Sequence, residues 1–594
     1  MIALRTAPTM YGLFAHVADR HTDRAAVVTP TGVSTYAELD AAVTRQAGGL
    51  AERGVGPGDV VAIFMGRGME LITAVLAASA CGAAWLTIDP ANPRRRVQSI
   101  VEQAAPSLVL VDDTTAGVLA GFETTTSLEL STSPISGLVR EAPADDVAYL
   151  VFTSGSTGVP KGVRVPQAGL ENLSAGIQQH LDIGPDDRLL QFSSTGFDAF
   201  VFEILMALTT GASLWLGPPE SLIVGEPLEN TIREHGITAV VLSPTAHGAI
   251  NPSRVPALRI LVSGAEQLTP AAVARWSAPG RKIINAYGPS EATVAVSMGV
   301  VSEGGRIDVG LPLPGFTVAI ADGDGCLHNE PGRVGELVAI GDGVALGYLP
   351  GAGERIDAFR LIASTDRAEP VRAYHTGDLA DLASDGRIMI RGRIGDQVKV
   401  RGHRVELGEV DAAAELSSDV VMCRTRAMPG PEGGLVLHSF IVAVDGTADA
   451  GLVIRLRKHL ADYLLAAMIP SVITVVPAIP LTVNGKTDWQ ALGSRQGVVG
   501  EPGTVRQGTL ERVLSVLAVV LSEHELGEGR LGSTDDFFMS GGHSLLVPMV
   551  ADRLQEQFGR KVPLRVIVRY RSAAGIAEWL DNSEPGLLDT PASR

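Results

Sequence analysis

The stretch that decides the fold runs from Val147 to Gly162 and reads VAYLVFTSGSTGVPKG. Its apolar start predicts a buried strand, and the residues that follow are mostly glycine, serine and threonine. Glycines let backbone N–H groups turn toward a phosphate, hydroxyls add donors, and Lys161 supplies a positive charge. The pattern differs from the common P-loop. Plain turns share this composition, but the length, the lysine and the preceding strand together indicate phosphate binding.

Short apolar runs continue on both sides of this loop and alternate with helical patterns from about Asp59 to about Val300. Examples are residues 59–66, 83–90, 107–113, 237–244 and 258–264. Continuous runs of this kind, bounded by Gly and Pro, are typical of strands buried on both faces of α/β sheets. From Gly310 to about Asp385, frequent Gly, Pro and Asp turns predict short antiparallel strands. A smaller α+β segment is expected to follow, to about Leu492.

The last part of the chain has a different texture. Residues 493–508 read GSRQGVVGEPGTVRQG, which has no periodicity and predicts a linker. Apolar residues then recur at helical spacing, which predicts two amphipathic helices and a short third helix, Ser572–Leu580, in a small bundle. The residues that carry this period are Leu510, Val513, Leu514, Leu517 and Leu521, then Leu546, Val550, Leu554 and Phe558.

Composition excludes several classes of protein. The 594 residues are 45% hydrophobic and 19% charged, which excludes disorder as the main state. The net charge of −18 argues against a nucleic-acid binder. The three cysteines are far apart, and the N-terminus lacks a signal-peptide pattern, so we expect a cytoplasmic protein. The uncharged stretch Leu71–Ile88 is broken by Gly82, which favours a buried helix over 71–80 and a strand over 83–88 rather than a membrane span.

Motifs distributed along the chain resemble those of a nonribosomal peptide synthetase adenylation domain followed by a peptidyl carrier (thiolation) domain. The adenylation domain is a member of the adenylate-forming superfamily of acyl-CoA synthetases and luciferases. Besides TSGSTGVPKG (153–162), the motifs are STYAEL (34–39), ASACGAAWLTIDP (78–90), FDAF (197–200), NAYGPSEATV (285–294), GELVAIGDGVALGYL (335–349), YHTGDLA (374–380), GRIGDQVKVRGHRVEL (392–407), LAAMIP (465–470), LTVNGKTD (481–488) and DDFFMSGGHSLL (535–546).

The resemblance implies an α/β protein. We expect a large adenylate-forming core of α/β sheets with a small β-barrel-like part, a small mobile α+β subdomain, and a C-terminal helical-bundle carrier domain. The expected boundaries are 1–394 for the core, 395–492 for the mobile subdomain, 493–508 for the linker, 509–582 for the carrier domain and 583–594 for a tail.

The resemblance also implies an ATP site. The residues expected to contact ATP or AMP are Thr153, Ser154, Gly155, Ser156, Thr157, Gly158, Lys161, Gly264, Ala265, Glu266, Asn285, Ala286, Tyr287, Gly288, Asp378, Arg393 and Lys486. The flat ring of Tyr287 can stack on adenine. Asp378 resembles the family's acceptor for the ribose hydroxyls, although a turn aspartate can also cap its own backbone.

Four of the expected residues are catalytic by resemblance: Thr153, Lys161, Glu291 and Lys486. Glu291 is placed to hold Mg²⁺, a hard cation that favours oxygen ligands. In the family the lysine at the position of Lys486 reaches the substrate carboxylate and the α-phosphate together, which offsets the repulsion between two anions. Outside these motifs, Glu291 and Lys486 would be read as ordinary surface residues.

Asp198 indicates the substrate class, because an aspartate there can pair with the α-ammonium of an amino acid. A helix N-cap is the alternative role for it. The residues expected to bind the substrate are Asp198, Ala199, Phe202, Val241, Leu261, Ser263, Ala286, Val294, Ala295 and Lys486. Apart from Asp198 and Lys486, none of these residues is charged, which disfavours a substrate with a charged side chain. Three alanines and one serine among them leave a roomy pocket with apolar walls, which favours tyrosine or phenylalanine, then tryptophan or leucine. A tyrosine phenol could then meet Ser263.

Two further positions concern the second half-reaction. Ser544 resembles the serine that receives 4′-phosphopantetheine, although it can also be a helix N-cap. Pro548 follows closely, and near a helix start its missing N–H is tolerated. Gly395 stands where the family often has a hinge aspartate. Because glycine tolerates large changes of φ and ψ, we expect the hinge motion to be retained.

The sequence thus predicts an ATP- and Mg²⁺-dependent ligase that forms an aminoacyl adenylate and transfers the acyl group to its own carrier arm in secondary metabolism. The alternatives are an aryl- or fatty-acid–carrier ligase and, in another class, an inactive scaffold with a docking carrier module. The expected partners are the amino acid, a phosphopantetheinyl transferase, and a tailoring enzyme or condensation domain acting in trans. An MbtH-like protein is a candidate helper. No nucleic acid or membrane partner is expected.

Overall fold

The computed structural model describes residues 5–119, 122, 124–126, 137–155, 160–350, 358–363, 369–394, 397–400, 402–429, 435–444, 452–480, 487–489, 492, 509–523, 531–533, 537–538, 540, 542, 546–559 and 562–582. The chain divides into two compact units. Unit 1 comprises Met1–Leu222 and Glu229–Glu406, and unit 2 comprises Ile223–Leu228 and Leu407–Arg594.

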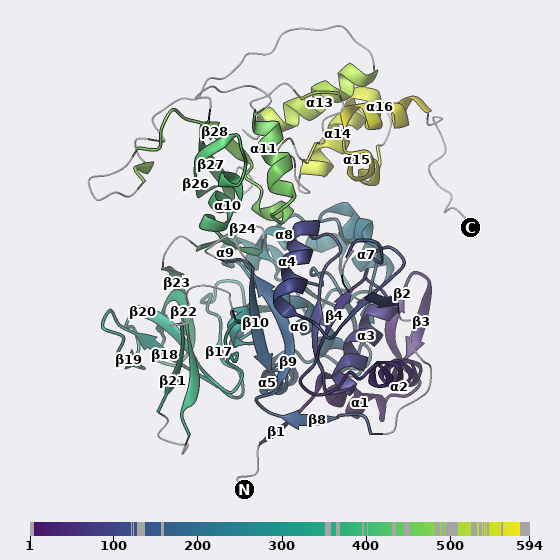
Figure 1. Ribbon diagram of the computed structural model, residues 1–594, viewed down its shortest axis with the longest axis vertical. Helices are drawn as coiled ribbons and strands as arrows, with labels where there is room; N and C mark the ends of the chain where they lie inside the picture. Colours follow the sequence, from purple (N-terminus) through teal and green to yellow (C-terminus); the bar gives the residue numbers. More distant parts are fainter. Residues whose placement is uncertain are drawn as a thin grey trace. The chain divides into compact units, whose positions relative to one another are not determined.

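Unit 1 contains a six-stranded sheet that carries the glycine-rich loop (Figure 1). Its order is β10 (Lys161–Pro166), β9 (Val147–Thr153), β5 (Ala84–Thr87), β4 (Val60–Phe64), β6 (Leu108–Val111) and β7 (Thr124–Thr126). The helices in this part of the sequence are α2 (Tyr36–Glu52), α3 (Met69–Ala80) and α4 (Arg94–Ala104). Only the β9–β10 pair among these strands is antiparallel, so the predicted buried parallel strands are confirmed.

The uncharged stretch predicted as a buried helix and strand forms α3 and β5. Every residue from Leu71 to Ala80 is buried, and so are all four residues of β5. Among the described residues, no helix is both long and apolar enough to cross a membrane.

A nine-stranded sheet forms the second layer of unit 1. Its order is β17 (Leu311–Pro312), β16 (Ser297–Val301), β15 (Lys282–Tyr287), β14 (Ile260–Ser263), β13 (Ala239–Leu242), β11 (Arg188–Leu190), β12 (Ser213–Trp215), β2 (Ala25–Thr29) and β3 (Gly32–Thr35). The strands from β11 to β15 pair in parallel, so their carboxyl ends share one edge. The α-helices in this part of the chain are α5 (Gln167–His180), α6 (Asp198–Leu208), α7 (Glu226–Glu234), α8 (Pro244–Gly248) and α9 (Pro270–Trp276).

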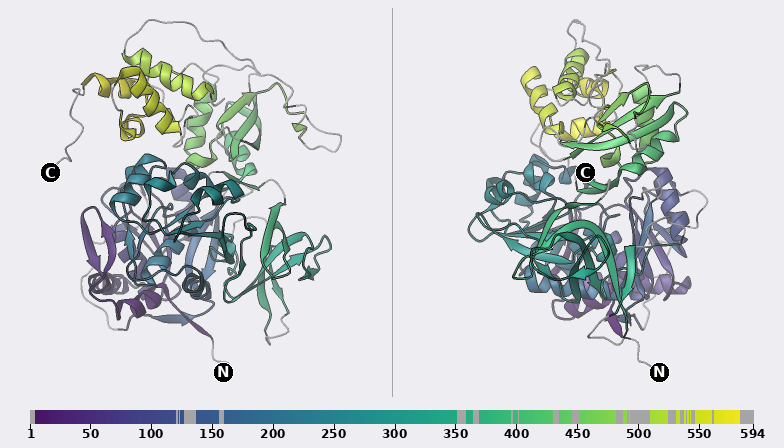
Figure 2. Two further views of the ribbon diagram at one scale, coloured as in Figure 1. Left: turned by 180° about the vertical axis from the view of Figure 1, so that it is seen from behind. Right: turned by 90° about the vertical axis from the view of Figure 1, so that its left-hand side faces the viewer.

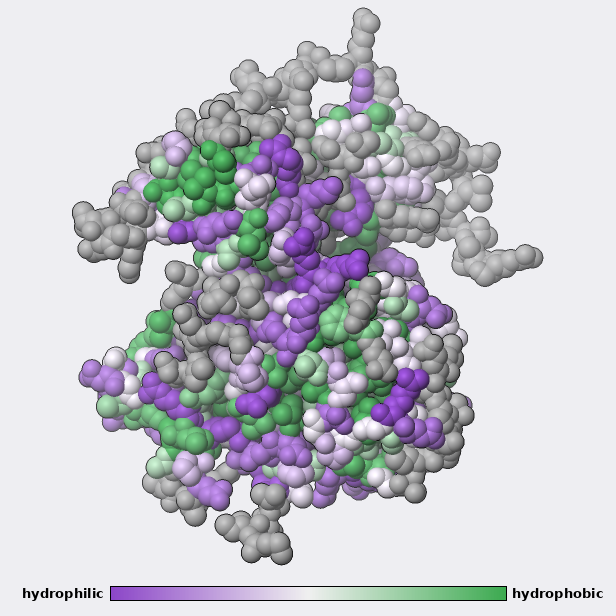
Figure 3. Space-filling view, in the orientation of Figure 1, coloured by the Kyte–Doolittle hydropathy of each residue, from purple (hydrophilic) through white to green (hydrophobic). Residues whose placement is uncertain are grey.

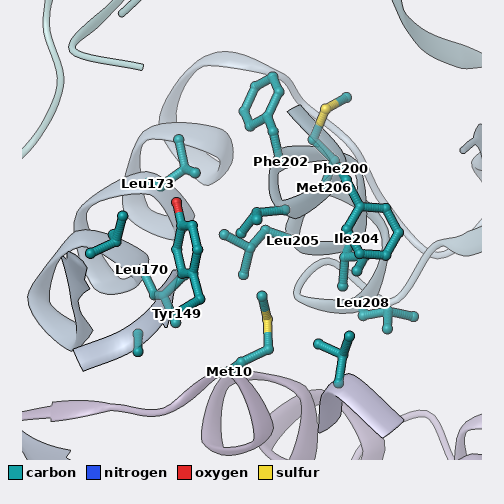
Figure 4. Packing of buried hydrophobic residues seen from close by; sticks show 14 of the residues in the cluster. Met10, Tyr149, Leu170, Leu173, Phe200, Phe202, Ile204, Leu205, Met206 and Leu208 are labelled. Carbon is teal, nitrogen blue, oxygen red and sulfur yellow. The ribbon is translucent and has the colours of Figure 1, made fainter. Parts of the chain in front are cut away.

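Helix α6 lies in the main hydrophobic core of unit 1. Residues Phe200–Leu208 are all buried, and all of them except Glu203 are apolar. Their side chains face those of Leu170 and Leu173 from α5 and of Met10 from α1 (Met10–Ala18) (Figure 4). This packing fixes the start of α6, where Asp198 is the first helical residue.

An antiparallel sheet stands beside these layers within unit 1 (Figures 1 and 2). It consists of β18 (Phe316–Ala321), β19 (Leu327–His328), β20 (Gly335–Gly341), β21 (Phe359–Ile362), β22 (Val371–Leu382) and β23 (Ile388–Arg393), which confirms the predicted change of texture. Two small antiparallel pairs complete the unit: β1 (Thr6–Pro8) with β8 (Glu141–Pro143), and β24 (Gln397–Val400) with β25 (His403–Glu406). We call the β24–β25 pair the hairpin. Short 3₁₀ helices cover Pro219–Leu222, Pro252–Arg254 and Ser290–Ala292.

Unit 2 begins its main segment with an α+β region. Strand β26 (Val420–Pro429) pairs antiparallel with β27 (Leu435–Ala443), and β28 (Val472–Val475) pairs with β27 in parallel. The helices are α10 (Leu407–Glu415), α11 (Leu452–Ala461) and the 3₁₀ turn Ala466–Met468. Hydrophobic residues gather on the surface over β26–β28 (Figure 3). Val421, Met422 and Val444, in and just after these strands in the sequence, are exposed.

Unit 2 also contains a helical region with its own core. The α-helices are α13 (Thr509–Glu523), α14 (Leu546–Phe558), α15 (Leu564–Tyr570) and α16 (Ala573–Asn582). The predicted period is confirmed, because Val513, Leu517 and Leu554 are buried in this core. The sequence reading missed α15, which has only seven residues and too few turns to show a period. Pro548 lies in the first turn of α14, where its missing N–H costs little.

Candidate active site

The glycine-rich loop leaves the carboxyl end of β9 and returns at the start of β10. Thr153 is the last residue of β9, and the buried Lys161 is the first of β10. The Lys161 ammonium lies 5.8 Å from the centre of the Tyr348 ring. Ser154 donates its hydroxyl to the backbone oxygen of Arg404 at 2.8 Å. The strand therefore positions the loop's two ends, as the sequence predicted.

Tyr287 and Asp378 meet on the expected nucleotide side, although 91 residues separate them. The Tyr287 hydroxyl donates to Asp378 Oδ2 at 2.5 Å, and Arg393 Nη1 lies 3.5 Å from Asp378 Oδ1. Burial, together with the Asp378 charge, raises the pKa of Tyr287 well above its usual value. Asn285 donates its amide to the Asp308 carbonyl at 2.9 Å, which fixes the end of β15.

Backbone approach explains two of the expected small residues. A Cβ on Gly288 would lie 2.5 Å from the Val294 carbonyl oxygen, so a side chain there would force the two segments apart. Ala265 adopts φ of 67°, a left-handed conformation that turns the chain after Gly264. Glu266 follows and accepts hydrogen bonds from the hydroxyl of Thr245 at 2.6 Å and from its N–H at 3.0 Å.

Glu291, the expected metal ligand, is buried in a 3₁₀ turn. Arg404 Nη1 lies 3.0 and 2.8 Å from its two oxygens, and the Tyr348 hydroxyl donates to Oε1 at 2.7 Å. Burial alone would raise the pKa of Glu291, but the Arg404 charge and the Tyr348 hydroxyl outweigh it and lower the pKa. The carboxylate is therefore ionised, which is the form that Mg²⁺ binds.

Asp198 opens α6 and accepts the Ser290 hydroxyl at 2.5 Å. Burial raises its pKa, and this effect outweighs the hydrogen bond from Ser290. Lys399 of the hairpin interacts electrostatically with both Asp378 and Asp198, while burial lowers the pKa of its ammonium. A positive charge near Asp198 stabilises the carboxylate form that an α-ammonium needs.

The structure divides the expected side-chain pocket between two faces of the nine-stranded sheet. Val241 is paired with Val262, so Val241 and Ala286 share one face while Leu261 and Ser263 lie on the other. The first face packs on the core that contains α6. Its pocket residues in this core are Phe202, Val241, Ala286, Val294 and Ala295. Ala199 lies one residue beyond Asp198 in α6.

On the other face, Ser263 contacts His247, which the sequence reading did not single out. His247 Nε2 lies 3.2 Å from Ser263 Oγ, and both side chains are buried. Burial and the nearby Arg275 charge lower the pKa of His247 to about 4, so its ring is neutral at pH 7. The ring packs edge-on against Trp276 at 5.8 Å.

Four further contacts were missed: Ser290, Tyr348, Lys399 and Arg404. Tyr348, Lys399 and Arg404 lie inside motifs quoted above, and Ser290 lies inside NAYGPSEATV. The signal was their presence in these motifs, but their partners are distant in sequence. The predicted Lys486, Ser544, Gly395, Ser156, Thr157 and Gly158, and the linker 493–508, lie outside the described residues.

The described residues fit a nucleotide with a divalent cation. An ionised buried carboxylate, an aromatic ring beside a second carboxylate, and a buried lysine meet at the ends of β9 and β15. Mg²⁺ is usually held by one or two carboxylates together with substrate phosphates. Glu291 provides such a carboxylate.

Comparison with known proteins identifies the class. The family model for AMP-binding enzymes matches residues 14–349, and that for the phosphopantetheine attachment site matches residues 511–580. Novobiocin biosynthesis protein H of Streptomyces niveus is 36% identical over 558 residues, which cover 91% of each chain. Phosphinothricin tripeptide synthetase PhsC of Streptomyces viridochromogenes is 34% identical over 96% of this chain and 52% of its own length.

Among solved structures, holo-PA1221, an NRPS protein containing adenylation and PCP domains, matches with a TM-score of 0.81 and 27% identity. The match covers 97% of both chains. This protein belongs to the AMP-binding enzyme family. Within that family it is an adenylating ligase of the nonribosomal peptide synthetase type, with an adenylation domain and a phosphopantetheine-bearing carrier domain. The predicted recognition, fold class, enzyme type and cofactors ATP, Mg²⁺ and 4′-phosphopantetheine are confirmed.

Proposed function

We propose that this ligase activates a large, uncharged, apolar amino acid, with aromatic residues preferred, and loads it on Ser544 of its own carrier domain. The main support for this substrate class is the combination of Asp198 with a group of apolar residues at the core around α6. Phe202 and Ala295 are buried in the α6 core, and Val241, Ala286 and Val294 pack against it. A charged side chain against such a wall would lack a partner, which costs several kcal/mol.

The proposed first step joins the amino acid to AMP. A carboxylate oxygen of the substrate attacks the α-phosphorus of ATP, the bond to the bridging oxygen breaks, and pyrophosphate leaves. The phosphates are proposed to be surrounded by residues of the glycine-rich loop, namely Thr153, Ser154, Gly155, Ser156, Thr157, Gly158 and Lys161. By resemblance to the family, Lys486 is proposed to reach both the substrate carboxylate and the α-phosphate. Glu291 would hold Mg²⁺, which would supply positive charge to the phosphates.

The remaining proposed contacts orient the two substrates. Tyr287 stacks on adenine, Asp378 accepts the ribose hydroxyls with Arg393 behind it, and backbone atoms of Gly264, Ala265, Asn285, Ala286 and Gly288 approach the nucleotide. Glu266 holds the turn at Ala265. Asp198 pairs with the α-ammonium, and Ala199 completes the residues around the side chain.

The proposed second step is thioester formation. The small subdomain is proposed to turn at Gly395. The pantetheine thiol on Ser544 gives its proton to solvent and attacks the acyl carbon, the bond from that carbon to the oxygen bridging to phosphorus breaks, and AMP leaves with the bridging oxygen. A phosphopantetheinyl transferase installs the arm. A tailoring enzyme or a condensation domain acting in trans then uses the loaded amino acid, and an MbtH-like protein is a candidate helper.

The test is pyrophosphate exchange across the common amino acids, each paired where possible with its desamino acid. We expect phenylalanine or tyrosine to give the highest kcat/KM, with tryptophan and leucine next. A small or charged amino acid in first place would contradict the pocket argument. Desamino acids as the best substrates would favour the aryl- or fatty-acid ligase, and no exchange at all would favour the inactive scaffold.

Thioester loading is tested separately by mass spectrometry of the holoprotein. Ser544→Ala is expected to keep pyrophosphate exchange but to gain neither the pantetheine mass nor the amino acid. Lys486→Ala is expected to lose exchange by roughly 10²–10³-fold, as when one preorganised donor is removed. Pantetheine on another residue, or normal exchange in Lys486→Ala, would refute the respective assignment.

A further inference from the structure

One segment of unit 1 leads directly into Asp198, the residue proposed to bind the α-ammonium. It covers residues 191–197, between the end of β11 and the start of α6, and we call it the α6 entry. The Phe197 N–H donates to the Ser194 carbonyl at 3.1 Å, which closes a turn immediately before Asp198. The Ser194 hydroxyl donates to Asp89 at 2.5 Å. The direction of the Asp198 side chain therefore depends on how this segment is held.

The carboxylate of Glu203, in α6, holds the first part of the α6 entry. Its Oε1 accepts the Phe192 N–H at 3.2 Å, the Ser193 N–H at 3.0 Å and the Ser193 hydroxyl at 2.9 Å. Its Oε2 accepts the side-chain amide of Gln191 at 3.0 Å. All four partner groups are donors. The arrangement therefore suits an ionised carboxylate, which only accepts hydrogen bonds, better than an amide or a protonated acid.

Glu203 is an unusual residue for its place in the helix. It is 1% exposed and is the only charged residue among the buried residues 200–208. Burial raises the pKa of its carboxyl to about 7, although the hydrogen bonds from the α6 entry lower it. Burying a carboxylate costs free energy unless its oxygens find partners. The donors of the α6 entry supply these partners, so the buried charge and the shape of this segment depend on each other.

Other contacts fasten the same segment to the six-stranded sheet. Arg67, which follows β4, donates to Gln191 Oε1 at 2.8 Å and to the Ser193 carbonyl at 2.9 Å. The hydroxyl of Thr87, the last residue of β5, donates to the Thr195 carbonyl at 2.5 Å. The α6 entry is thus fixed from both sides, by α6 and by the neighbouring sheet.

We propose that Glu203 is a positioning residue for Asp198: by fixing the α6 entry, its carboxylate aims the Asp198 side chain at the α-ammonium of the substrate. This inference rests on the proposed role of Asp198. When Glu203 is changed, the α6 entry can adopt other shapes, and Asp198 is then only partly in the productive orientation. The loss falls on substrates that carry the ammonium. A purely structural role for Glu203 would affect all substrates alike.

The first experiment is pyrophosphate exchange at pH 8 with phenylalanine and tyrosine, each beside its desamino acid. Glu203→Gln keeps the size of the side chain but turns an amide toward the four donors. We expect kcat/KM for the amino acids to fall about 10–100-fold, and kcat/KM for the desamino acids to change less than about twofold. The matched control is Glu229→Gln. It alters another buried carboxylate of unit 1, which accepts the Asn251 N–H at 2.7 Å, and should keep the wild-type ratio of amino acid to desamino acid.

The second experiment is a double-mutant cycle with Asp198→Asn. In the Asp198→Asn background we expect Glu203→Gln to lower kcat/KM for phenylalanine by less than about twofold, because no charge is left to aim. Arg67→Met loosens the α6 entry from its other side and should give the same selective loss, to a smaller extent. Calorimetric binding of ATP with Mg²⁺ shows which variants are folded.

Three results would overturn the inference: unchanged amino acid activity in Glu203→Gln, equal losses for amino and desamino acids in a variant that binds ATP, or additive effects in the cycle. If Glu203→Gln does not bind ATP, Arg67→Met decides, because a selective loss supports the inference and an equal loss or none overturns it. Wild-type amino acid activity in Asp198→Asn is a different failure, because it would remove the role of Asp198 from the proposed function.

Discussion

The two halves of the candidate site are built in different ways. We call Tyr287, Asp378, Glu291, Arg404 and Asp198 the charged half. Its members are joined to each other or to neighbours by hydrogen bonds and ion pairs, such as Tyr287 to Asp378 at 2.5 Å. The apolar half comprises Phe202, Val241, Ala286, Val294 and Ala295, which are assembled by packing around the α6 core.

The two halves also restrict their residue types to different degrees. A hydrogen-bonded carboxylate needs particular atoms at particular distances, so its residue types are restricted. An apolar wall tolerates substitutions that conserve its volume. The charged half should therefore act on every amino acid alike, and the apolar half should separate one amino acid from another. The four predictions below test this division.

The largest effect is expected at Asp198. Asp198→Asn keeps the shape but removes the charge that pairs with an α-ammonium, and truncating a buried charge pair costs about 2–5 kcal/mol. We expect kcat/KM in pyrophosphate exchange to fall by about 10²-fold or more for every amino acid, with their ratios preserved. Desamino acids serve as the control and should lose nothing. An equal loss for desamino acids would contradict the charge-pair role.

The next effect concerns the apolar half. Ala295 is buried in the α6 core, so Ala295→Leu would overfill this region at a cost of about 1–3 kcal/mol. We expect kcat/KM for the best large substrate to fall by about 10–100-fold, and kcat/KM for alanine as the substrate to fall less. Retained ATP binding shows that the variant is folded. A uniform loss across all amino acids would assign Ala295 to the common machinery instead.

A smaller effect is expected at Tyr287. Tyr287→Phe keeps a ring that can stack but leaves Asp378 without the hydroxyl at 2.5 Å. A hydrogen bond to a charged group contributes about 1.5–3 kcal/mol, so KM for ATP should rise about tenfold or more. Ratios between amino acids should stay constant, since the contact belongs to the charged half. A changed ratio between amino acids with an unchanged KM for ATP would show that Tyr287 does not belong to the charged half.

The smallest effect is expected at Ser263. Its hydroxyl already contacts His247 at 3.2 Å, on the sheet face opposite Val241 and Ala286. We therefore expect Ser263→Ala to change the tyrosine-to-phenylalanine ratio of kcat/KM by less than about threefold, compared with a much larger change for a hydroxyl-binding site. A tenfold loss for tyrosine would instead place the phenol at Ser263.

The pH dependence of this ratio sharpens the same test. Burial lowers the pKa of His247 from 6.5 to about 4, so the folded state disfavours the charged ring. Stability linked to His247 is present above pH 6.5 and is lost as pH falls toward 4. Between pH 6.5 and 8 we expect the ratio to be constant, because the ring stays neutral there.

Much of the fold could be predicted from local patterns. The apolar runs at 59–66 and 258–264 became β4 and β14, and the stretch 71–88 became α3 and β5. Helix α15 could not be predicted, because seven residues show less than two full helical periods. The candidate site residues Tyr287, Asp378 and Glu291 were predicted from the resemblance to the family.

What the sequence alone determined is the class of chemistry, because phosphate, ammonium and metal recognition each require a few residue types in fixed local patterns. The tertiary structure alone decided which of these residues meet. It brought Arg404 onto Glu291 across 113 positions, paired Tyr287 with Asp378, and turned Ser263 toward His247 and away from the face of Val241. Such contacts arise from strand register and chain crossings, and no local pattern encodes the partner of a distant side chain.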